Sequence, residues 1–302
     1  MPMTQDQYLD LLNKSIKKVF FKEYDRYENE WQQFCTKETT KRRDETFSEL
    51  TGFGMIPVLT EGSKMTEDRA YQGYDVTITP RVRARMTSVT KLMYMNAEHV
   101  KIQQMVEDMA EKFQYTKDYN FAVIFNSGFT TTYYAGGDGK ALFADDHPRS
   151  IGLGGTWPNE PATGSVLSET SLRAAIKAME AQLDDRGLKI KLKPEALVYH
   201  PDNEWIAREI LQSEKTPNSG NNAINPLKNR VKPVQYNFLT SSAPWFLTSN
   251  KSKKRMLYLE RWPINREKDS DIDTMNLIFT ADECYEFGFT DNGRSLYGNP
   301  GS

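Results

Sequence analysis

The chain has 302 residues and a net charge of −2; 38% of its residues are hydrophobic and 12% are aromatic. At about 150 residues per domain, this length predicts two domains or one domain with large insertions. The hydrophobic share is low for a compact domain and the aromatic share is too high for a disordered chain, so we expect an ordered, extended protein. The balanced charge excludes the overall basic excess of a dedicated nucleic-acid binder.

Residues 4–48 are expected to form a charged helical arm. Apolar side chains recur at helical spacing from Tyr8 to Val19, and the aromatic residues Tyr24 and Trp31 follow. Acidic and basic residues are balanced along the segment. Two interpretations stay open: the arm lies across the surface of a partner, or it is an ordinary amphipathic helix on its own core.

Residues 50–92 are expected to form a long two-stranded excursion with a loop at 61–68. Glycines break any helix after Thr51, and from Tyr74 the side chains alternate with a period of two, as in a strand. Pro80 favours an edge or hairpin position, because proline cannot donate a hydrogen bond. The alternation separates two faces, which carry Arg81, Arg83 and Arg85 on one side and Val76, Ile78, Val82, Ala84 and Met86 on the other. Such an excursion, with few apolar residues expected at its tip, cannot easily bury itself, so we expect it to lean on another chain.

A helix of up to about 30 residues is expected next. Asn96 is a good N-cap, apolar residues follow at helical spacing to about Phe125, and an interruption is possible in principle near Thr116. Its methionines are interpreted as packing residues rather than ligands. Residues 130–166 are rich in Gly, Thr and Pro and are expected to be a linker.

The second half predicts a mixture of helices and short strands. Ser168 caps a clear helix that ends near Gly187, Asp202 opens another, and a polar loop follows at 218–222. The expected strands are 188–192, 196–199, 234–239, 245–248, 256–262, 276–280 and 284–289. This order of elements indicates an α+β fold.

Several classes of protein are excluded by what the sequence lacks. The longest apolar run, Phe121–Phe125, is far shorter than the ~20 residues of a membrane helix, and the first ten residues carry no apolar block of a secretory signal. Cys35 and Cys284 lack the spacing of a disulfide framework or a zinc site. We therefore expect a reducing, intracellular origin, no membrane contact and no cofactor.

One group of residues has the chemistry of a catalytic site. Asp145, Asp146 and His147, together with His200, could supply ligands to a divalent metal, as in a hydrolase. Their spacing matches no known ligand motif, however, and Asp-His-Pro is also a natural turn. The structural interpretation is favoured, and no catalysis is expected.

Two short segments concentrate basic residues. The row Arg81, Arg83 and Arg85 is expected to pair with carboxylates of a neighbouring chain rather than with DNA. The cluster from Lys251 to Arg255 is interpreted as a polar turn between two strands.

An ordered set of segments resembles the major capsid proteins of tailed phages, specifically the Mu-type major head subunit group, which share the Hong Kong 97 capsid fold. The resemblance is strongest over 140–250. It is carried by Ala141-Leu142-Phe143-Ala144-Asp145-Asp146-His147-Pro148, Gly154-Gly155, Leu167-Ser168, Asp184-Asp185-Arg186-Gly187, Lys193-Pro194-Glu195-Ala196-Leu197-Val198, Ala207-Arg208-Glu209-Ile210-Leu211, Asn225-Pro226-Leu227-Lys228 and Trp245-Phe246-Leu247.

The resemblance implies a division of the chain into the parts of a capsid subunit. These parts are an N-terminal arm (1–48), an extended β-hairpin loop (49–92), a peripheral domain with a long spine helix (93–190), an axial domain (191–256) and returning strands of the peripheral domain (257–302). The implied function is self-assembly as hexamers and pentamers into an icosahedral shell around double-stranded DNA.

The implied partners are further copies of the chain, together with scaffolding, portal and decoration proteins and weakly, non-specifically held DNA. The implied location is the virion, after assembly in the host cytoplasm. Candidate intersubunit contacts are Arg81, Arg83, Arg85, Lys64, Trp31 and Tyr24. Two alternatives stay open: an encapsulin-like nanocompartment shell, and, more distantly, the metal-dependent hydrolase.

Overall fold

The computed structural model describes residues 5–90, 93, 99–133, 136–150, 154–216, 223–270 and 276–302, and for 5–15, 99 and 270 it describes the backbone alone. The helices are α1 (Gln5–Arg26), α3 (His99–Asn126), α4 (Glu169–Glu180), α5 (Glu204–Gln212) and α6 (Ser252–Arg255), with 3-10 turns η1 (Trp31–Gln33) and η2 (Pro201–Asn203). The strands are β1 (Thr36–Thr39), β2 (Glu45–Leu50), β3 (Gln72–Ile78), β4 (Arg81–Val89), β5 (His147–Pro148), β6 (Thr156–Trp157), β7 (Pro194–Tyr199), β8 (Lys232–Gln235), β9 (Trp245–Ser249), β10 (Met256–Ser270), β11 (Leu277–Phe289) and β12 (Leu296–Asn299).

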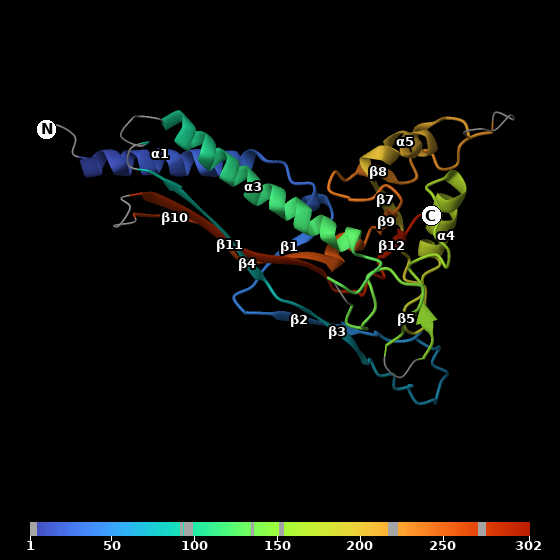
Figure 1. The fold of residues 1–302 in the computed structure, drawn as a ribbon. Helices are drawn as coiled ribbons and strands as arrows, with labels where there is room; N and C mark the ends of the chain where they lie inside the picture. Colours follow the sequence, from blue (N-terminus) through green and yellow to red (C-terminus); the bar gives the residue numbers. More distant parts are fainter. Residues whose placement is uncertain are drawn as a thin grey trace.

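Two four-stranded sheets organise the chain. The first has the order β1-β10-β11-β4, and the second has the order β12-β9-β7-β8. In Figure 1, α1 and α3 run along the first sheet and make an elongated body, while α4 and α5 flank the second sheet at one end. The pair β2-β3 extends from the lower side of this body. Within the described part of the chain, no helix is both long enough and apolar enough to cross a membrane.

The arm helix α1 packs on its own chain. Ile16 and Phe20 are fully buried against Val106 and Phe113 of α3 and Phe279 of β11. Of the two interpretations left open for this segment, the described part of α1 therefore follows the second, an amphipathic helix on its own core. The predicted stripe residue Tyr8 has no described side chain.

The helical part of the arm ends earlier than expected. The sequence predicts a helical arm over residues 4–48, but α1 stops at Arg26, and the chain then forms η1, β1 and β2. The Trp31 ring stacks on Tyr258 with 4.5 Å between ring centroids, which anchors the chain beside β10. Residues Thr36–Thr39 then form β1, which joins the sheet parallel to β10. The β-branched threonines at the two ends of β1 favour a strand.

The predicted arginine strand is two strands. β3 pairs with β2, whereas β4 pairs with β11, so the chain changes partner at Thr79 and Pro80. Pro80 lacks the N–H that a continuous ladder would need, which gives the physical reason for the break. The expected two-stranded excursion is thus shorter, because β4 belongs to the main sheet.

The two helices that the sequence defines best differ from expectation only at their ends. α3 runs without interruption through Thr116, whose hydroxyl donates to the Lys112 carbonyl within the helix. Ser168 caps α4 with a capping box, as expected, but α4 ends at Glu180, and Gly187 (φ 80°) serves a later turn. The predicted cap Asn96 and the predicted loop 218–222 lie outside the described residues.

Three further segments differ from expectation. Residues 188–192 form no strand beyond an isolated bridge between Leu183 and Lys189. Residues 251–255 lie in and beside the helical turn α6. β12 pairs with β9, so the chain beyond β11 returns to the second sheet, where Tyr297 packs beside Leu172 of α4. The expected linker 130–166 is also structured, since Leu142 and Trp157 are buried.

Candidate intersubunit surfaces

The arginine row of β4 is engaged mainly with its own chain. Arg83 donates from Nη1 to the Tyr285 carbonyl over 2.5 Å, and its guanidinium lies 4.0 Å from the centre of the Tyr285 ring. Its Nη2 is 3.4 Å from Glu286, which also approaches Arg81 at 3.4 Å. The Arg81 side chain stays 76% exposed. Arg83 is therefore held in place, while Arg81 can still turn toward a neighbour.

Tyr24 lies at a buried ion pair that joins α1, α3 and β11. The Lys117 ammonium is 2.8 Å from Glu283, and both side chains are at most 6% exposed. The Tyr24 hydroxyl donates to the same carboxylate over 3.1 Å and also contacts the Lys117 ammonium. Burial raises the pKa of Glu283, although the lysine beside it opposes the rise. The predicted contact Tyr24 thus works inside one chain, where it fixes the arm to the long helix.

Trp31 is also an interior residue, only 6% exposed. Besides stacking on Tyr258, its backbone N–H donates to the Asp118 carboxylate of α3 over 3.1 Å. Burial raises the pKa of Asp118 to about 6. The large aromatic residues of the arm therefore anchor it to its own core.

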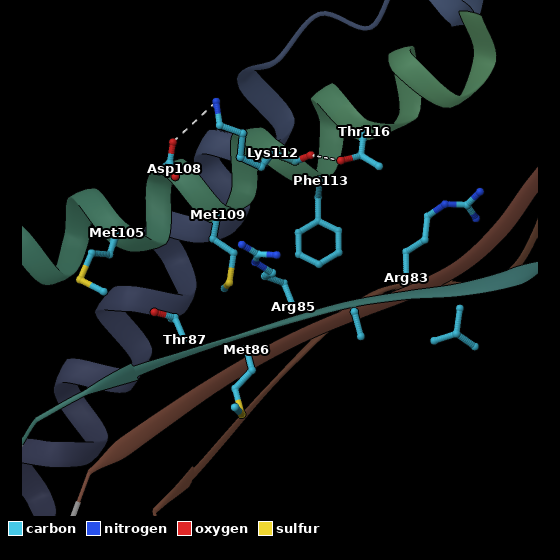
Figure 2. A pocket seen from close by; sticks show the side chains of 12 residues that line it. Arg83, Arg85, Met86, Thr87, Met105, Asp108, Met109, Lys112, Phe113 and Thr116 are labelled. Carbon is cyan, nitrogen blue, oxygen red and sulfur yellow. Dashed lines mark hydrogen bonds and ion pairs between the residues drawn. The ribbon is translucent and has the colours of Figure 1, made fainter. Parts of the chain in front are cut away.

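A groove of about 750 Å³ lies between α3 and β4. Figure 2 shows Arg83 and Arg85 pointing from the strand toward the helix, while Met86 points to the opposite side of the sheet. The buried side chains Met109 and Phe113 supply apolar lining. On the opposite side of the sheet, Val82 (58%) and Met86 (63%) are exposed. The sequence separates the two faces correctly, but in β4 the arginine face is the one that meets the helix.

Arg85 differs from its neighbours in the row. It lines the groove, and among the residues that the structure describes no carboxylate forms an ion pair with it. On the rim of the groove, Lys112 and Asp108 form an exposed pair at 3.8 Å. The groove thus combines an apolar floor with a charge that is available to a second molecule.

The segment between β2 and β3, together with Leu50 at the end of β2, carries a long series of exposed large hydrophobic residues, which we call the exposed apolar cluster and which reasoning from the sequence missed. Its exposed large hydrophobic residues are Leu50 (70%), Phe53 (65%), Met55 (81%), Ile56 (93%), Val58 (94%), Leu59 (57%), Met65 (86%) and Tyr71 (49%). The signal is visible in the run Phe53-Gly54-Met55-Ile56-Pro57-Val58-Leu59. Lys64, a predicted contact, is exposed in the same segment. Apolar side chains gathered in this way mark a surface for another protein.

The residues of the proposed metal site are not brought together. His147 is fully buried, its Nδ1 is 2.6 Å from Asp138, and its ring stacks on Trp157 at 4.3 Å. Asp146 pairs instead with Lys140, and His200 lies in η2 beside Asp202. Over the described ranges, no group of three or more His, Cys, Asp or Glu side chains is placed to hold a metal ion. His147 and Pro148 form the short strand β5, so the Asp-His-Pro segment has a structural role, but it is not the turn that the sequence predicts.

Together these features define a class of protein: an α+β subunit with an arm, an extended loop and a long helix beside a twisted hairpin sheet. A family model described as phage capsid protein matches residues 73–291. The chain therefore belongs to the phage capsid protein family. Its function is that of a major capsid protein, a structural subunit of a phage head.

Solved structures agree with this assignment at the level of the fold. The capsid of Ralstonia phage GP4 is similar with a TM-score of 0.57 at 10% identity, covering 89% of this chain and 87% of that one. The capsid of bacteriophage JBD30 is similar with a TM-score of 0.56 at 14% identity, covering 71% and 92%. No curated protein sequence matches this chain.

The fold extends beyond phage heads. A virus-like particle from Pyrococcus furiosus is similar with a TM-score of 0.50 at 7% identity, covering 95% of this chain and 98% of that one. The fold alone would leave the nanocompartment alternative open, and the family match favours the phage capsid. The predicted α+β capsid fold and the predicted family are confirmed, while the Mu-type group stays a prediction. A capsid protein associates with copies of itself, which supports the first of the predicted partners.

Proposed function

We propose that the chain is the head subunit of a tailed phage that assembles as hexamers and pentamers into an icosahedral shell around double-stranded DNA. The observation that carries this proposal is the exposed apolar cluster between β2 and β3, where Met55, Ile56 and Val58 are 81–94% exposed. Monomeric soluble proteins seldom gather such side chains in water, because their burial in an interface is favourable by about 25 cal/mol per Å².

The loop of one copy is proposed to seat on a neighbouring copy at the groove between α3 and β4. The groove offers the apolar lining of Met109 and Phe113, and Arg85 faces it without an acidic partner among the described residues. Glu61 of the loop complements Arg85 in charge. Arg81, Arg83 and Lys64 remain candidate contacts of the same interface, and the five-part division of the chain into arm, loop, peripheral domain, axial domain and returning strands belongs to this proposal.

The remaining partners are proposed from the net charge and from the family. A net charge of −2 is consistent with loose, non-specific contact with packaged DNA, since phosphate binding depends on concentrated basic charge. Scaffolding, portal and decoration proteins would complete the particle, and assembly would take place in the host cytoplasm. The virion is the location that the family itself indicates.

The test is to change the loop while leaving the body intact. The native chain is expected to form closed shells or rings of capsomers in negative-stain electron microscopy, with matching mass by light scattering. The triple variant Met55→Ser, Ile56→Ser, Val58→Ser is expected to stay folded but unassembled, because it removes the apolar area that the interface buries.

The matched control is Ile56→Leu with Val58→Ile, which alters the same positions but keeps them apolar, and it is expected to assemble like the native chain. Normal shells from the triple variant would refute the role of the loop. A native chain that stays monomeric at high concentration, with and without co-expressed scaffolding protein, would refute the proposed function as a whole.

A further inference from the structure

One side chain of the body reaches the extended segment 51–71. Arg186, in the turn that follows α4, donates from Nη1 to the Asp68 carboxylate over 3.1 Å and from Nη2 to the Arg69 carbonyl. Its guanidinium also lies 5.4 Å from the centre of the Tyr71 ring. The Arg186 side chain is only 15% exposed, whereas the Asp68 side chain is 41% exposed. In Figure 1 the segment passes below β5, on the same side of the molecule as this turn.

Asp68 connects the two limbs of the segment to each other as well as to Arg186. Its Oδ2 accepts the Gly54 N–H over 2.7 Å, and its Oδ1 accepts the Arg69 N–H over 2.8 Å. These hydrogen bonds, with that of Gly54 the strongest influence, lower the pKa of Asp68. One carboxylate thus joins the start of the segment at Gly54, its end at Arg69, and the body at Arg186. We call Arg186, Asp68 and the Gly54 N–H the clasp.

The clasp leaves the apolar side chains of the loop uncovered. Between its two limbs, Ile56 and Val58 are more than 90% exposed and Met65 is 86% exposed. The clasp therefore does not hide the docking surface. Its effect is to hold both ends of residues 55–67, which restricts the conformations of the loop before any second molecule arrives.

We propose that Arg186 is a positioning residue for assembly, which acts through Asp68 to order the extended loop in the free subunit. Ordering a loop during association costs free energy, and a loop that is already held loses less. The forked geometry of an arginine suits this role, because it reaches a carboxylate and a carbonyl at once. The inference rests on the proposed function, since it assumes that the loop docks on another copy.

The test compares Asp68→Ala and Arg186→Gln with the matched control Glu67→Ala. The control removes an acidic side chain from the same loop, but that side chain contacts only the exposed Arg69, with both partners about three-quarters exposed. Hydrogen exchange of the amides of 52–71 is measured on the unassembled chain. Light scattering then gives the protein concentration at which shells begin to form.

We expect amide hydrogen exchange in the loop to accelerate about tenfold in both clasp variants. This is the size of effect expected when the hydrogen bonds made by one ionised group are lost. The onset concentration for assembly is expected to rise several-fold, while Glu67→Ala behaves like the native chain. Arg186→Lys keeps the charge but not the fork, so it is expected to resemble Arg186→Gln. Unchanged thermal unfolding in all variants shows that the body stays folded.

Three outcomes would overturn the inference, and they separate it from the proposed function. Native exchange rates in Asp68→Ala would show that the clasp does not order the loop. Faster exchange with a native onset concentration would show that the ordering does not matter for assembly, while leaving the capsid function intact. A native chain that forms no shells would overturn the proposed function, and this inference with it.

Discussion

Two regions of the molecule treat charged and apolar side chains in opposite ways. One is the contact among α1, α3 and β11, and the other is the extended loop 51–71. In the first region charge is buried, with the Lys117 side chain 6% and the Glu283 side chain 2% exposed. In the second region apolar side chains stand in water, with Ile56 93% exposed. The first region is satisfied within one chain, whereas the second is proposed to be completed by another molecule. On that proposal, stability of the subunit and assembly of the shell depend on separate sets of residues.

The largest effect is expected from breaking the buried ion pair. Lys117→Met leaves the Glu283 carboxylate without its cation in the interior, and losing one partner of such a pair costs about 3–5 kcal/mol of unfolding free energy. Chemical denaturation of the unassembled chain measures this loss. The double variant Lys117→Met, Glu283→Gln is expected to recover much of the stability, because it removes the unpaired charge.

Lys112→Met is the matched control for this prediction, since Lys112 lies on the same helix in an exposed pair with Asp108 at 3.8 Å. We expect it to cost less than about 1 kcal/mol. Equal losses for Lys117→Met and Lys112→Met would contradict the view that burial makes the first pair important.

Local signals were enough for the parts of the fold that depend on neighbours in sequence. Ser168 and its capping box fix the start of α4, and the ordered motifs of 140–250 led to the family. Alternation after Tyr74 separated the arginine face from the apolar face. The alternation pattern does not show which of the two faces is covered. In β4 that depends on distant residues, since Arg83 packs on Tyr285, 202 residues away.

The candidate surface was predicted only in part, because local sequence patterns do not show which side chains distant residues cover. A loop was predicted at 61–68, whereas the described loop spans 51–71 between β2 and β3. Its apolar cluster was overlooked because residues such as Ile56 and Val58 look like ordinary core residues in sequence. Tyr24 and Trp31 pack within their own chain, which the sequence could not show, since aromatic side chains on an arm suit a partner's surface or the chain's own interior equally well. Only the packing of η1 beside β10 and α3 separates these cases.

A second, smaller effect tests the buried region through pH. The pKa of Asp118 is raised to about 6 by burial, so the folded chain binds this proton more tightly than the unfolded chain, in which the pKa is about 3.9. The stability that this group contributes is therefore complete below about pH 4 and is lost as the pH rises through about 6.

Asp118→Asn is expected to remove this dependence, because the amide oxygen still accepts the Trp31 N–H but carries no charge. Relative to the native chain, the variant should gain about 2 kcal/mol of unfolding free energy between pH 4 and pH 7.5. Denaturant titrations at a series of pH values measure the difference, with Asp108→Asn as the exposed control on the same helix. Parallel pH profiles for the native chain and Asp118→Asn would refute the assignment.

The smallest effect on stability is expected where the largest effect on assembly is proposed. Ile56→Ser removes an apolar side chain that is already in water in the free subunit, so the unfolding free energy of the unassembled chain should change by no more than about 0.5 kcal/mol. Ile124→Ser provides the contrast, because Ile124 is 1% exposed in the core and its truncation is expected to cost at least about 2 kcal/mol. If Ile56→Ser destabilised the free subunit as much as Ile124→Ser does, the loop would belong to the interior of one chain, and the division between a self-sufficient body and an incomplete loop would fail.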